Sequence, residues 1–352
     1  MKNTPIFFAL LVLVCLTGCG GCNRNNSRPK PDTSSIKLTV KMERFDQDFA
    51  AFKNADYNTQ ADFMRSKYGP FFDFYVSRIV IGPRPGDDTT NIDEPAVKKF
   101  IADSYINRIQ DSIDYYFKST ADIDAQLTQS FKYLKYYFPQ IQTPHVIGVN
   151  SGFSLGAFTY QKDVLGIGLD LYFGTNNPDY DSAGIYQYLQ HKMRREYISR
   201  NAMEVLYNLY FGDEEASRGK PLIEAMVDKG KKLFFISYML PDAPDSMIAG
   251  FTQKQTKWCE ANEYEIWKYL NEKDLLYNQS YMDQKRYLDE GPTTSGMPAE
   301  SPGNIGGWIG LQIVRRFMKE TDGKIPLNEL ITRYSAKAII DKARYRPSKS
   351  VF

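Results

Sequence analysis

The stretch from Asn201 to Leu240 constrains the fold most, because it contains two apolar segments with helical spacing. The first includes Met203–Tyr207, the second runs from Glu224 to Leu240, and the polar turn Gly212–Gly219 joins them. Apolar stripes of this kind must be buried against another element. We expect these two helices to form the packed centre of the domain.

Helical spacing also dominates most of the remaining chain. Residues 43–138 and 183–346 predict helices, and Phe45, Phe49 and Phe52 begin the first apolar stripe. In the C-terminal part we expect helices at about 183–199, 202–210, 220–239, 254–272 and 304–320, followed by two short ones. Because no repeat period links these helices, a helical solenoid is not expected.

The segment 144–173 has a different character. Its apolar residues and glycines predict three strands, the last two joined by a hairpin turn at Gln161–Asp163. Ile36–Met42 alternates apolar and polar residues and predicts one further strand. We therefore expect an α+β fold, mainly helical with a small antiparallel sheet in mid-chain, and a single globular domain over residues 36–352.

The N-terminus has the pattern of a secretory signal followed by a lipid attachment site. Lys2 precedes the apolar run Ile6–Gly18, which is too short to span a bilayer, since a spanning helix needs about 20 residues. Leu16–Cys19 places small residues before a cysteine, the pattern read by a bacterial lipoprotein signal peptidase. We expect residues 1–18 to be removed and Cys19 to be lipidated. An ordinary signal peptide with an incidental cysteine is the alternative.

Residues 19–35 are almost free of apolar side chains and predict a flexible tether. The lipid on Cys19 makes the membrane the first expected partner. The protein would be anchored in the cell envelope and face the periplasm, because no acidic run of the kind expected for surface export follows Cys22. Whether the anchor lies in the inner or the outer membrane stays open.

The charged residues of the chain are nearly balanced. There are 44 Lys and Arg against 42 Asp and Glu, a net charge of +2. This balance gives no electrostatic footprint for nucleic acid, so no nucleic-acid partner is expected. Beyond the signal and Cys19, the cysteines are Cys22 and Cys259, whose separation argues against a disulfide. Cys259 has no basic neighbour in sequence and is expected to be a buried thiol.

The common catalytic patterns lack essential residues in this chain. A zinc peptidase of the His-Glu-x-x-His type needs two imidazoles one helical turn apart, with a glutamate as base. On the first helix, Met203 and Tyr207 stand where the histidines belong, and Glu204 is expected on a solvated face. The nucleophile elbow and the phosphate-binding loop are also missing, and Gly303–Trp308 favours close packing of a helix on a sheet. We expect no enzyme activity and no cofactor.

A metallopeptidase with an unusual site stays open as a second function. It would have to use both histidines of the chain, His145 and His191, with acidic residues such as Asp170.

A glycan-binding lipoprotein is the third possibility, suggested by the aromatic content of 14%. The residues weighed for such a role are Trp258, Glu263 and Trp267 on one expected helix and Trp308 on a later one. Trp258 and Trp267 are nine residues apart on one expected helix, which places them on opposite faces and weakens the case for a tryptophan cradle.

Several segments carry a resemblance to a known family. They are Gly166–Gly174, Glu224–Phe235, Met239–Pro241, Phe251–Trp258, and Ser301–Gly310 with Ile313 and Val314. In order and spacing they resemble the gliding-motility lipoproteins of the GldB type, over about Val40 to Tyr334. The resemblance implies a role in gliding and in the associated type IX secretion apparatus, with envelope proteins of that apparatus as partners.

That family is distantly similar to gluzincin peptidases, in which His-Glu-x-x-His is followed by a second helix bearing Glu-Gly. Lys229–Gly230 stands at the Glu-Gly position, and a lysine there opposes metal binding by its charge. The resemblance therefore implies a zincin-like scaffold without metal or catalytic residues. Lys229, Gly230, Trp258, Glu263 and Trp308 become candidate partner or groove residues.

Overall fold

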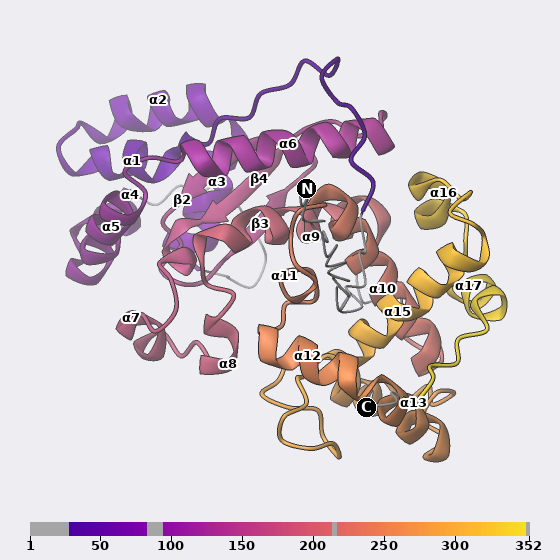
Figure 1. Ribbon diagram of the computed structural model, residues 1–352. Helices are drawn as coiled ribbons and strands as arrows, with labels where there is room; N and C mark the ends of the chain where they lie inside the picture. Colours follow the sequence, from indigo (N-terminus) through magenta and orange to yellow (C-terminus); the bar gives the residue numbers. More distant parts are fainter. Residues whose placement is uncertain (1–27, 83–93, 213–216, 350–352) are drawn as a thin grey trace, which may run out of the picture.

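The computed structural model describes residues 28–82, 94–212 and 217–349. Helices make up most of these residues, and one four-stranded sheet lies among them (Figure 1). The α+β class, mainly helical with a small sheet in mid-chain, is confirmed. Cys19 and Cys22 lie outside the described residues, as do residues 213–216 of the expected Gly212–Gly219 turn.

The sheet is mixed, so the expected antiparallel arrangement is wrong for two of its three pairings. The strands are β1 (Glu43–Arg44), β2 (His145–Val149), β3 (Ala157–Tyr160) and β4 (Val164–Gly168). Their order is β1-β2-β4-β3, with β1–β2 and β2–β4 parallel and β3–β4 antiparallel. After β2 the chain crosses to the edge of the sheet and forms β3 there. The Gln161–Asp163 turn then brings the chain back as β4, which lies between β3 and β2.

Ile36–Met42, expected as a strand, forms no ladder in the structure. The backbone N–H of Val40 donates to Thr128 Oγ1 at 2.9 Å, and that of Met42 donates to Asp124 Oδ1 at 3.0 Å. Both acceptors belong to helix α6 (Ala121–Tyr137). Side chains of a helix therefore satisfy donors that a neighbouring strand would otherwise bond.

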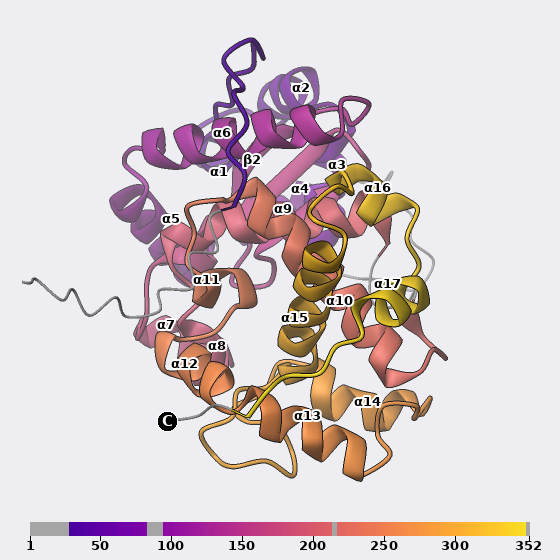
Figure 2. The same ribbon diagram turned by 45° about the vertical axis from the view of Figure 1, so that its right-hand side comes forward.

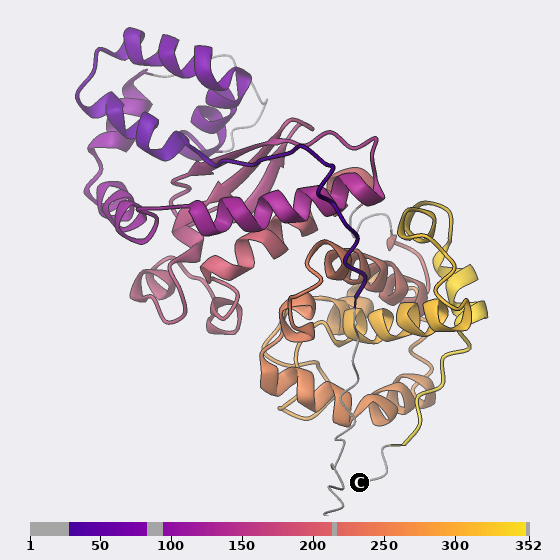
Figure 3. The ribbon, with the colours of Figure 1, turned by 45° about the horizontal axis from the view of Figure 1, so that its top comes forward.

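The sheet separates two hydrophobic cores. Ile147, Val149 and Val164 pack with an aromatic core built from N-terminal helices. Val146 and Leu165, one residue out of step, pack with the larger core that contains α6 and the C-terminal helices. The alternation follows from the two-residue period of a strand. Figure 3 shows the sheet between the indigo and violet helices and the orange and yellow ones.

The aromatic core is supplied by short helices before residue 82. They are α1 (Phe45–Ala50), a 3-10 turn (Ala51–Lys53), α2 (Tyr57–Tyr68), α3 (Pro70–Tyr75) and a π turn (Val76–Val80). We define the aromatic core by Phe45, Phe49, Phe52, Tyr68, Phe71, Phe72 and Tyr75, all buried. The expected helical stripe of Phe45, Phe49 and Phe52 is confirmed, with ring centroids of successive members 5.7 and 5.3 Å apart.

Three further helices complete the predicted helical region 43–138. They are α4 (Glu94–Ala102), α5 (Ser104–Tyr116) and α6. Asp103 caps α5 by accepting from the backbone N–H groups of Tyr105 and Ile106, which satisfies donors that a helix start leaves free.

The expected helix at 183–199 is wrong. The chain forms a 3-10 turn at Leu169–Tyr172 and then α7 (Pro178–Ser182), α8 (Gln187–Gln190), a 3-10 turn at Arg195–Tyr197 and α9 (Ile198–Phe211). Phe173 and Arg194 form an isolated antiparallel bridge, and Gly174 N donates to Met193 O at 2.8 Å. This bridge holds residues 193 and 194 extended and delays the helix until Ile198.

Residues 217–349 contain eight helices. They are α10 (Leu222–Met239), α11 (Asp245–Ala249), α12 (Gln253–Ala261), α13 (Glu263–Glu272), α14 (Tyr281–Leu288), α15 (Ile305–Glu320), α16 (Leu327–Thr332) and α17 (Ala336–Ala343). The expected helix at 254–272 is interrupted at Asn262, whose side-chain amide donates to Trp258 O at 2.8 Å. Trp258 and Trp267 therefore lie on two helices, so their nine-residue spacing does not place them on opposite faces of one helix.

Helices α10 and α15 cross in backbone contact (Figure 2). A Cβ on Gly230 would lie 2.2 Å from the Gly310 carbonyl carbon, and one on Gly310 would lie 1.7 Å from Met226 O. Glycines permit this close approach because they lack a Cβ. The expectation that Gly303–Trp308 opens a closely packed helix holds, but the partners are helices: a Cβ on Gly306 would meet Leu288 and Met226.

Residues 28–35, within the expected tether, contact the folded domain. The Arg28 guanidinium donates to Ala243 O and pairs with Asp245, which also pairs with Arg315 at 2.8 Å. Thr33 is buried and accepts from the Gln129 side-chain amide at 3.1 Å. Among the described residues, no helix is both long and apolar enough to span a membrane.

Candidate functional site

A polar hollow lies where α9, α10, α14 and the start of α15 meet. We call it the basic pocket; its volume is about 540 Å³. Five cationic side chains line it, against three acidic ones. The cations are Lys192, Arg200, Lys229, Lys232 and Lys285, and the acids are Glu204, Asp289 and Glu290.

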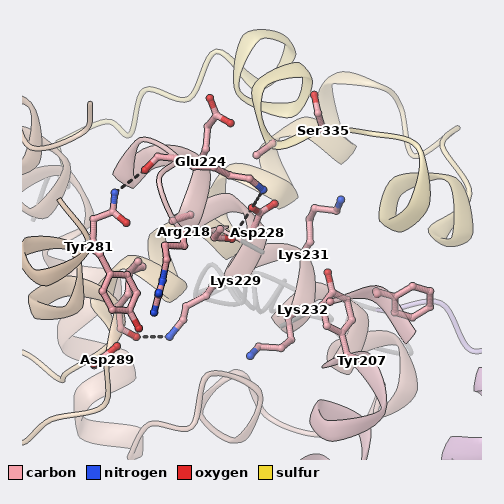
Figure 4. Close-up of a pocket in the computed structure, with 18 of the residues that line it drawn as sticks. Tyr207, Arg218, Glu224, Asp228, Lys229, Lys231, Lys232, Tyr281, Asp289 and Ser335 are labelled. Atoms are coloured by element: carbon pink, nitrogen blue, oxygen red, sulfur yellow. Dashed lines mark hydrogen bonds and ion pairs between the residues drawn. The ribbon is translucent and has the colours of Figure 1, made fainter. Parts of the chain in front are cut away.

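A second hollow of about 330 Å³, which we call the mixed pocket, adjoins the first. The two share five wall residues: Lys229, Lys232, Tyr281, Lys285 and Asp289. The mixed pocket adds apolar surface from Tyr207, Phe211 and Leu288. In Figure 4, Arg218 lies beside the Tyr281 ring, 4.6 Å from its centroid, while Lys229 and Lys232 extend from α10.

Glu204 is at the centre of the charges on α9. The Arg200 guanidinium donates to its Oε2, and Lys232 Nζ lies 3.3 Å from its Oε1. Burial raises the pKa of this carboxyl, but the positive charges of Arg200, Lys232 and Lys192 outweigh that effect and hold the pKa well below the usual range. The side chain is only 28% exposed, so the expected solvated face is wrong and Glu204 is an ionised pocket wall.

Helix α10 supplies three lysines within four residues, Lys229, Lys231 and Lys232, ahead of an apolar run. Lys229 Nζ donates to Leu288 O and lies 3.5 Å from Asn304 Oδ1, so it joins α10 to α14 and to the start of α15. Lys231 is buried and donates to Tyr334 O at 2.9 Å, and burial lowers its pKa. Lys232 is buried beside Glu204. The three lysines thus bond to three different parts of the structure: α14, the segment at Tyr334, and α9.

The positions compared with zinc ligands have different surroundings. Met203 is fully buried in the larger core. Tyr207 packs against Phe211 and Phe235, with ring centroids 5.3 Å away in both cases, and lines the mixed pocket. Lys229 lines both pockets. The helical pair α9 and α10 is therefore present as expected, with core side chains and cations at these positions.

The remaining candidate groove residues do not line either pocket. Gly230 packs directly against the backbone of Gly310, and Trp308 is buried in the larger core. Trp258 is half-buried against the same core, and Glu263 accepts from the Tyr345 hydroxyl at 2.6 Å. The predicted residues thus do not form one groove.

The histidines and Asp170 do not form one site. His145 is exposed at the start of β2, with Nδ1 3.3 Å from Glu43 Oε1. Both ring nitrogens of His191 face carbonyl oxygens, of Tyr188 at 2.8 Å and Gly250 at 2.9 Å. Within residues 28–82, 94–212 and 217–349, no three His, Cys, Asp or Glu side chains gather in a way that could hold a metal ion.

Asp170 organises the loop after β2. Its carboxylate accepts from the backbone N–H and hydroxyl of Ser151 at 2.9 and 2.8 Å, and from the backbone N–H of Phe153. Burial raises its pKa to about 6, while these hydrogen bonds act in the opposite direction. Cys259 is buried as expected, and burial raises the pKa of its thiol.

Sequence reasoning missed most of the basic pocket. Lys192, Arg200 and Lys285 come from three separate segments, and only folding brings them to one hollow. One local signal was available: Lys231 and Lys232 interrupt a run of α10 that is apolar on nearly every face. Lysines at such positions must find partners or a cavity, because an unpaired buried charge is costly.

The comparisons with known proteins identify a family. No curated protein and no solved structure matches the chain. The family model described as gliding motility protein GldB matches residues 26–347, which is most of the chain. The protein is accordingly a gliding-motility lipoprotein of the cell envelope, and the chain belongs to the GldB family.

Proposed function

We propose that this protein supports gliding motility and the associated type IX secretion machinery as a non-enzymatic component. It is anchored through a lipid on Cys19, faces the periplasm, and acts through contacts with other envelope proteins. The type IX link and these partners follow from the family resemblance.

One observation carries the non-enzymatic part of the proposal. The α9–α10 pair is packed with Met203 in the core, and its glutamate is held between Arg200 and Lys232. A carboxylate with a strongly lowered pKa is a poor general base, because proton affinity falls with the pKa. The positive pocket around it also disfavours a catalytic cation.

Gene deletion with complementation tests the proposal. Deletion is expected to abolish gliding and type IX secretion, and the wild-type gene to restore both. Normal gliding and normal secretion after deletion would contradict the proposal. A second contradiction would be robust peptidase activity of the purified protein that disappears in Glu204→Gln.

Crosslinking identifies the partners. Photo-crosslinking residues are placed at three exposed positions on different elements, Tyr115, Tyr186 and Met282. Crosslinks to envelope proteins from one position, absent from the other two, would locate the contact surface. Cys19→Ser is the matched control for anchoring. It is expected to lose acyl labelling, and persistent labelling would show that another residue carries the lipid.

A further inference from the structure

The basic pocket has more positive charge than its own acids can neutralise. Together the described walls of the two pockets carry eight cationic and five acidic side chains. The excess is concentrated rather than spread, because the whole chain carries only +2. Like charges in a hollow repel one another more strongly than in bulk water. A bound anion would relieve that repulsion.

The lowered pKa of Glu204 reflects the same positive charges. Its carboxyl is partly removed from water, which by itself favours the neutral form, yet the cations reverse this and favour the charged form. The three cations that contribute are Arg200 on α9, Lys232 on α10 and Lys192 in the segment before α9. An anion entering the same hollow would experience the same field.

The remaining pairs show where an anion can compete. Lys192 Nζ lies 3.0 Å from Glu290, which is 41% exposed, and Lys285 Nζ lies 3.3 Å from Asp289, which is 40% exposed. Surface ion pairs contribute about 0–1 kcal/mol, so Lys285, itself 42% exposed, can exchange partners at small cost. Lys192 is only 15% exposed, but its carboxylate partner lies at the surface. The start of α15 at Asn304 adds the positive end of a helix to the same wall.

The type of cation indicates the type of anion. The Arg200 guanidinium bonds to Glu204, Asn201 and the Ile248 carbonyl, and Lys229 and Lys232 have partners within the walls. Lys192 and Lys285, whose carboxylate partners are about 40% exposed, are therefore the principal donors of the basic pocket. The guanidinium fork fits carboxylates and phosphates alike, whereas ammonium groups act as point charges. Several lysines around one hollow favour the anion with the greater charge and the most acceptor oxygens, and a phosphoryl group has both more charge and more acceptor oxygens than a carboxylate. The adjoining mixed pocket offers the Tyr281 ring and apolar side chains to the rest of such a ligand.

We propose that the basic pocket binds the phosphoryl group of an organic phosphate ester, whose uncharged part lies in the mixed pocket against Tyr281. Lys192 and Lys285 donate to the phosphoryl group, and Lys229 and Lys232 add positive charge from α10. The ester can come from a phospholipid headgroup or from a phosphorylated sugar, which share this chemistry. The site does not depend on the proposed role in secretion.

Isothermal titration of the full lipidated protein in neutral detergent tests the site. The probes are glycerol 3-phosphate, glucose 1-phosphate and inorganic phosphate, with glycerol and glucose as uncharged controls and gluconate as the carboxylate control. Both esters are expected to bind, and affinity should fall as salt rises because the attraction is screened. Tighter glycerol 3-phosphate binding would support a lipid source, and tighter glucose 1-phosphate binding a sugar source.

Substitutions at the mouth of the pocket distinguish a built site from surface charge. Lys192→Gln and Lys285→Gln should each weaken ester binding about tenfold, the loss of one charged hydrogen bond. Glu290→Gln should tighten it about threefold by removing an opposing charge. Lys324→Gln, an exposed lysine outside both pockets, is the matched control and should change nothing.

Three outcomes would overturn the proposal. The first is equal binding of gluconate and the esters. The second is phosphate binding that is the same in Lys192→Gln, Lys285→Gln and Lys324→Gln, which means an adventitious ion only. The third is no ester binding by a protein whose melting temperature matches that of the folded variants.

Discussion

The aromatic core on one side of the sheet and the α9–α10 pair on the other are held together by different chemistry. In the aromatic core, rings pack on rings: Phe52 and Phe72 stack with centroids 6.0 Å apart, and Phe45 meets Tyr75 at 4.6 Å. In the α9–α10 pair, Arg200, Lys231 and Lys232 are buried among apolar side chains.

The difference shows which part of the molecule is shaped for stability alone. Apolar rings need only the correct spacing and volume, and they gain free energy from burial itself. Buried charges cost free energy unless each finds a partner, so they are a poor way to stabilise a core. Their presence around a hollow is therefore better explained by a ligand than by packing.

The largest effect is expected in the aromatic core. Phe72→Ala removes a ring that is 0% exposed, and should lower the free energy of unfolding by about 3–5 kcal/mol. Chemical denaturation measures the change. Phe63→Ala, at a position 44% exposed on α2, is the control and should have a small effect. Similar losses for both would mean that burial does not control stability on this side of the sheet.

The next effect concerns the crossing of α10 and α15. Gly310→Ala introduces a Cβ only 1.7 Å from Met226 O. Overpacking should cost about 3 kcal/mol, offset by about 1 kcal/mol of helix propensity. The net loss of about 2 kcal/mol is measured by denaturation. In Gly291→Ala the nearest atom is 3.3 Å from the new Cβ, so its loss should be smaller. An unchanged Gly310→Ala protein would contradict the backbone contact.

The charged side of the comparison predicts a pH dependence. Because the pKa of Glu204 is lowered on folding, its stabilising contribution is complete above the unfolded value of about 4.5 and declines as pH falls toward the lowered pKa. Glu204→Gln should lose about 1–2 kcal/mol at pH 7, by leaving Arg200 without its charged partner. The loss should shrink below about pH 4, where the unfolded wild-type chain takes up the proton.

Unfolding curves of both proteins between pH 3 and pH 7 measure this difference. Glu290→Gln, which removes a carboxylate that is 41% exposed, is the matched control and should stay within about 0.5 kcal/mol of wild type. A constant difference between Glu204→Gln and wild type at all pH values would show that packing, rather than charge, holds Glu204.

The smallest effect is expected at Arg28, where the described part of the chain begins. Arg28→Gln should lower the free energy of unfolding by about 1 kcal/mol, because Asp245 keeps its other partner, Arg315, at 2.8 Å. Lys30→Gln is the control, since Lys30 is 54% exposed and its pair with Asp242 lies at the surface. Equal and negligible effects of both variants would mean that Arg28 does not fasten this segment to the domain.

Local patterns were sufficient for part of the fold. The stripe of Phe45, Phe49 and Phe52, the helix that begins near Leu222 and the hairpin at Gln161–Asp163 follow from spacing and turn residues, and the structure contains them. The interruption at Asn262 could not be read in the same way. The residue that ends α12 bonds to Trp258 O, and asparagine is also tolerated inside helices.

The candidate site was the least predictable part. The sequence indicated Lys229, which lines both pockets, but it equally indicated Trp308 and Glu263, which line neither. Burial of a tryptophan depends on the helices packed around it, and pairing of a glutamate with Tyr345 depends on a contact across 82 residues. The spacing of apolar residues along the chain predicts neither the burial of Trp308 nor the pairing of Glu263.

By itself, the sequence determined most of the helical stretches, the mid-chain position of three strands, the lipoprotein pattern and the family. Each of these rests on neighbouring residues or on segments in order. Only the tertiary structure decided the parallel direction of β2 and β4 and the meeting of Lys192, Lys229 and Lys285 in one hollow. Strand direction and charge clustering depend on how distant segments pack, and the energies that select them arise only when those segments are in contact.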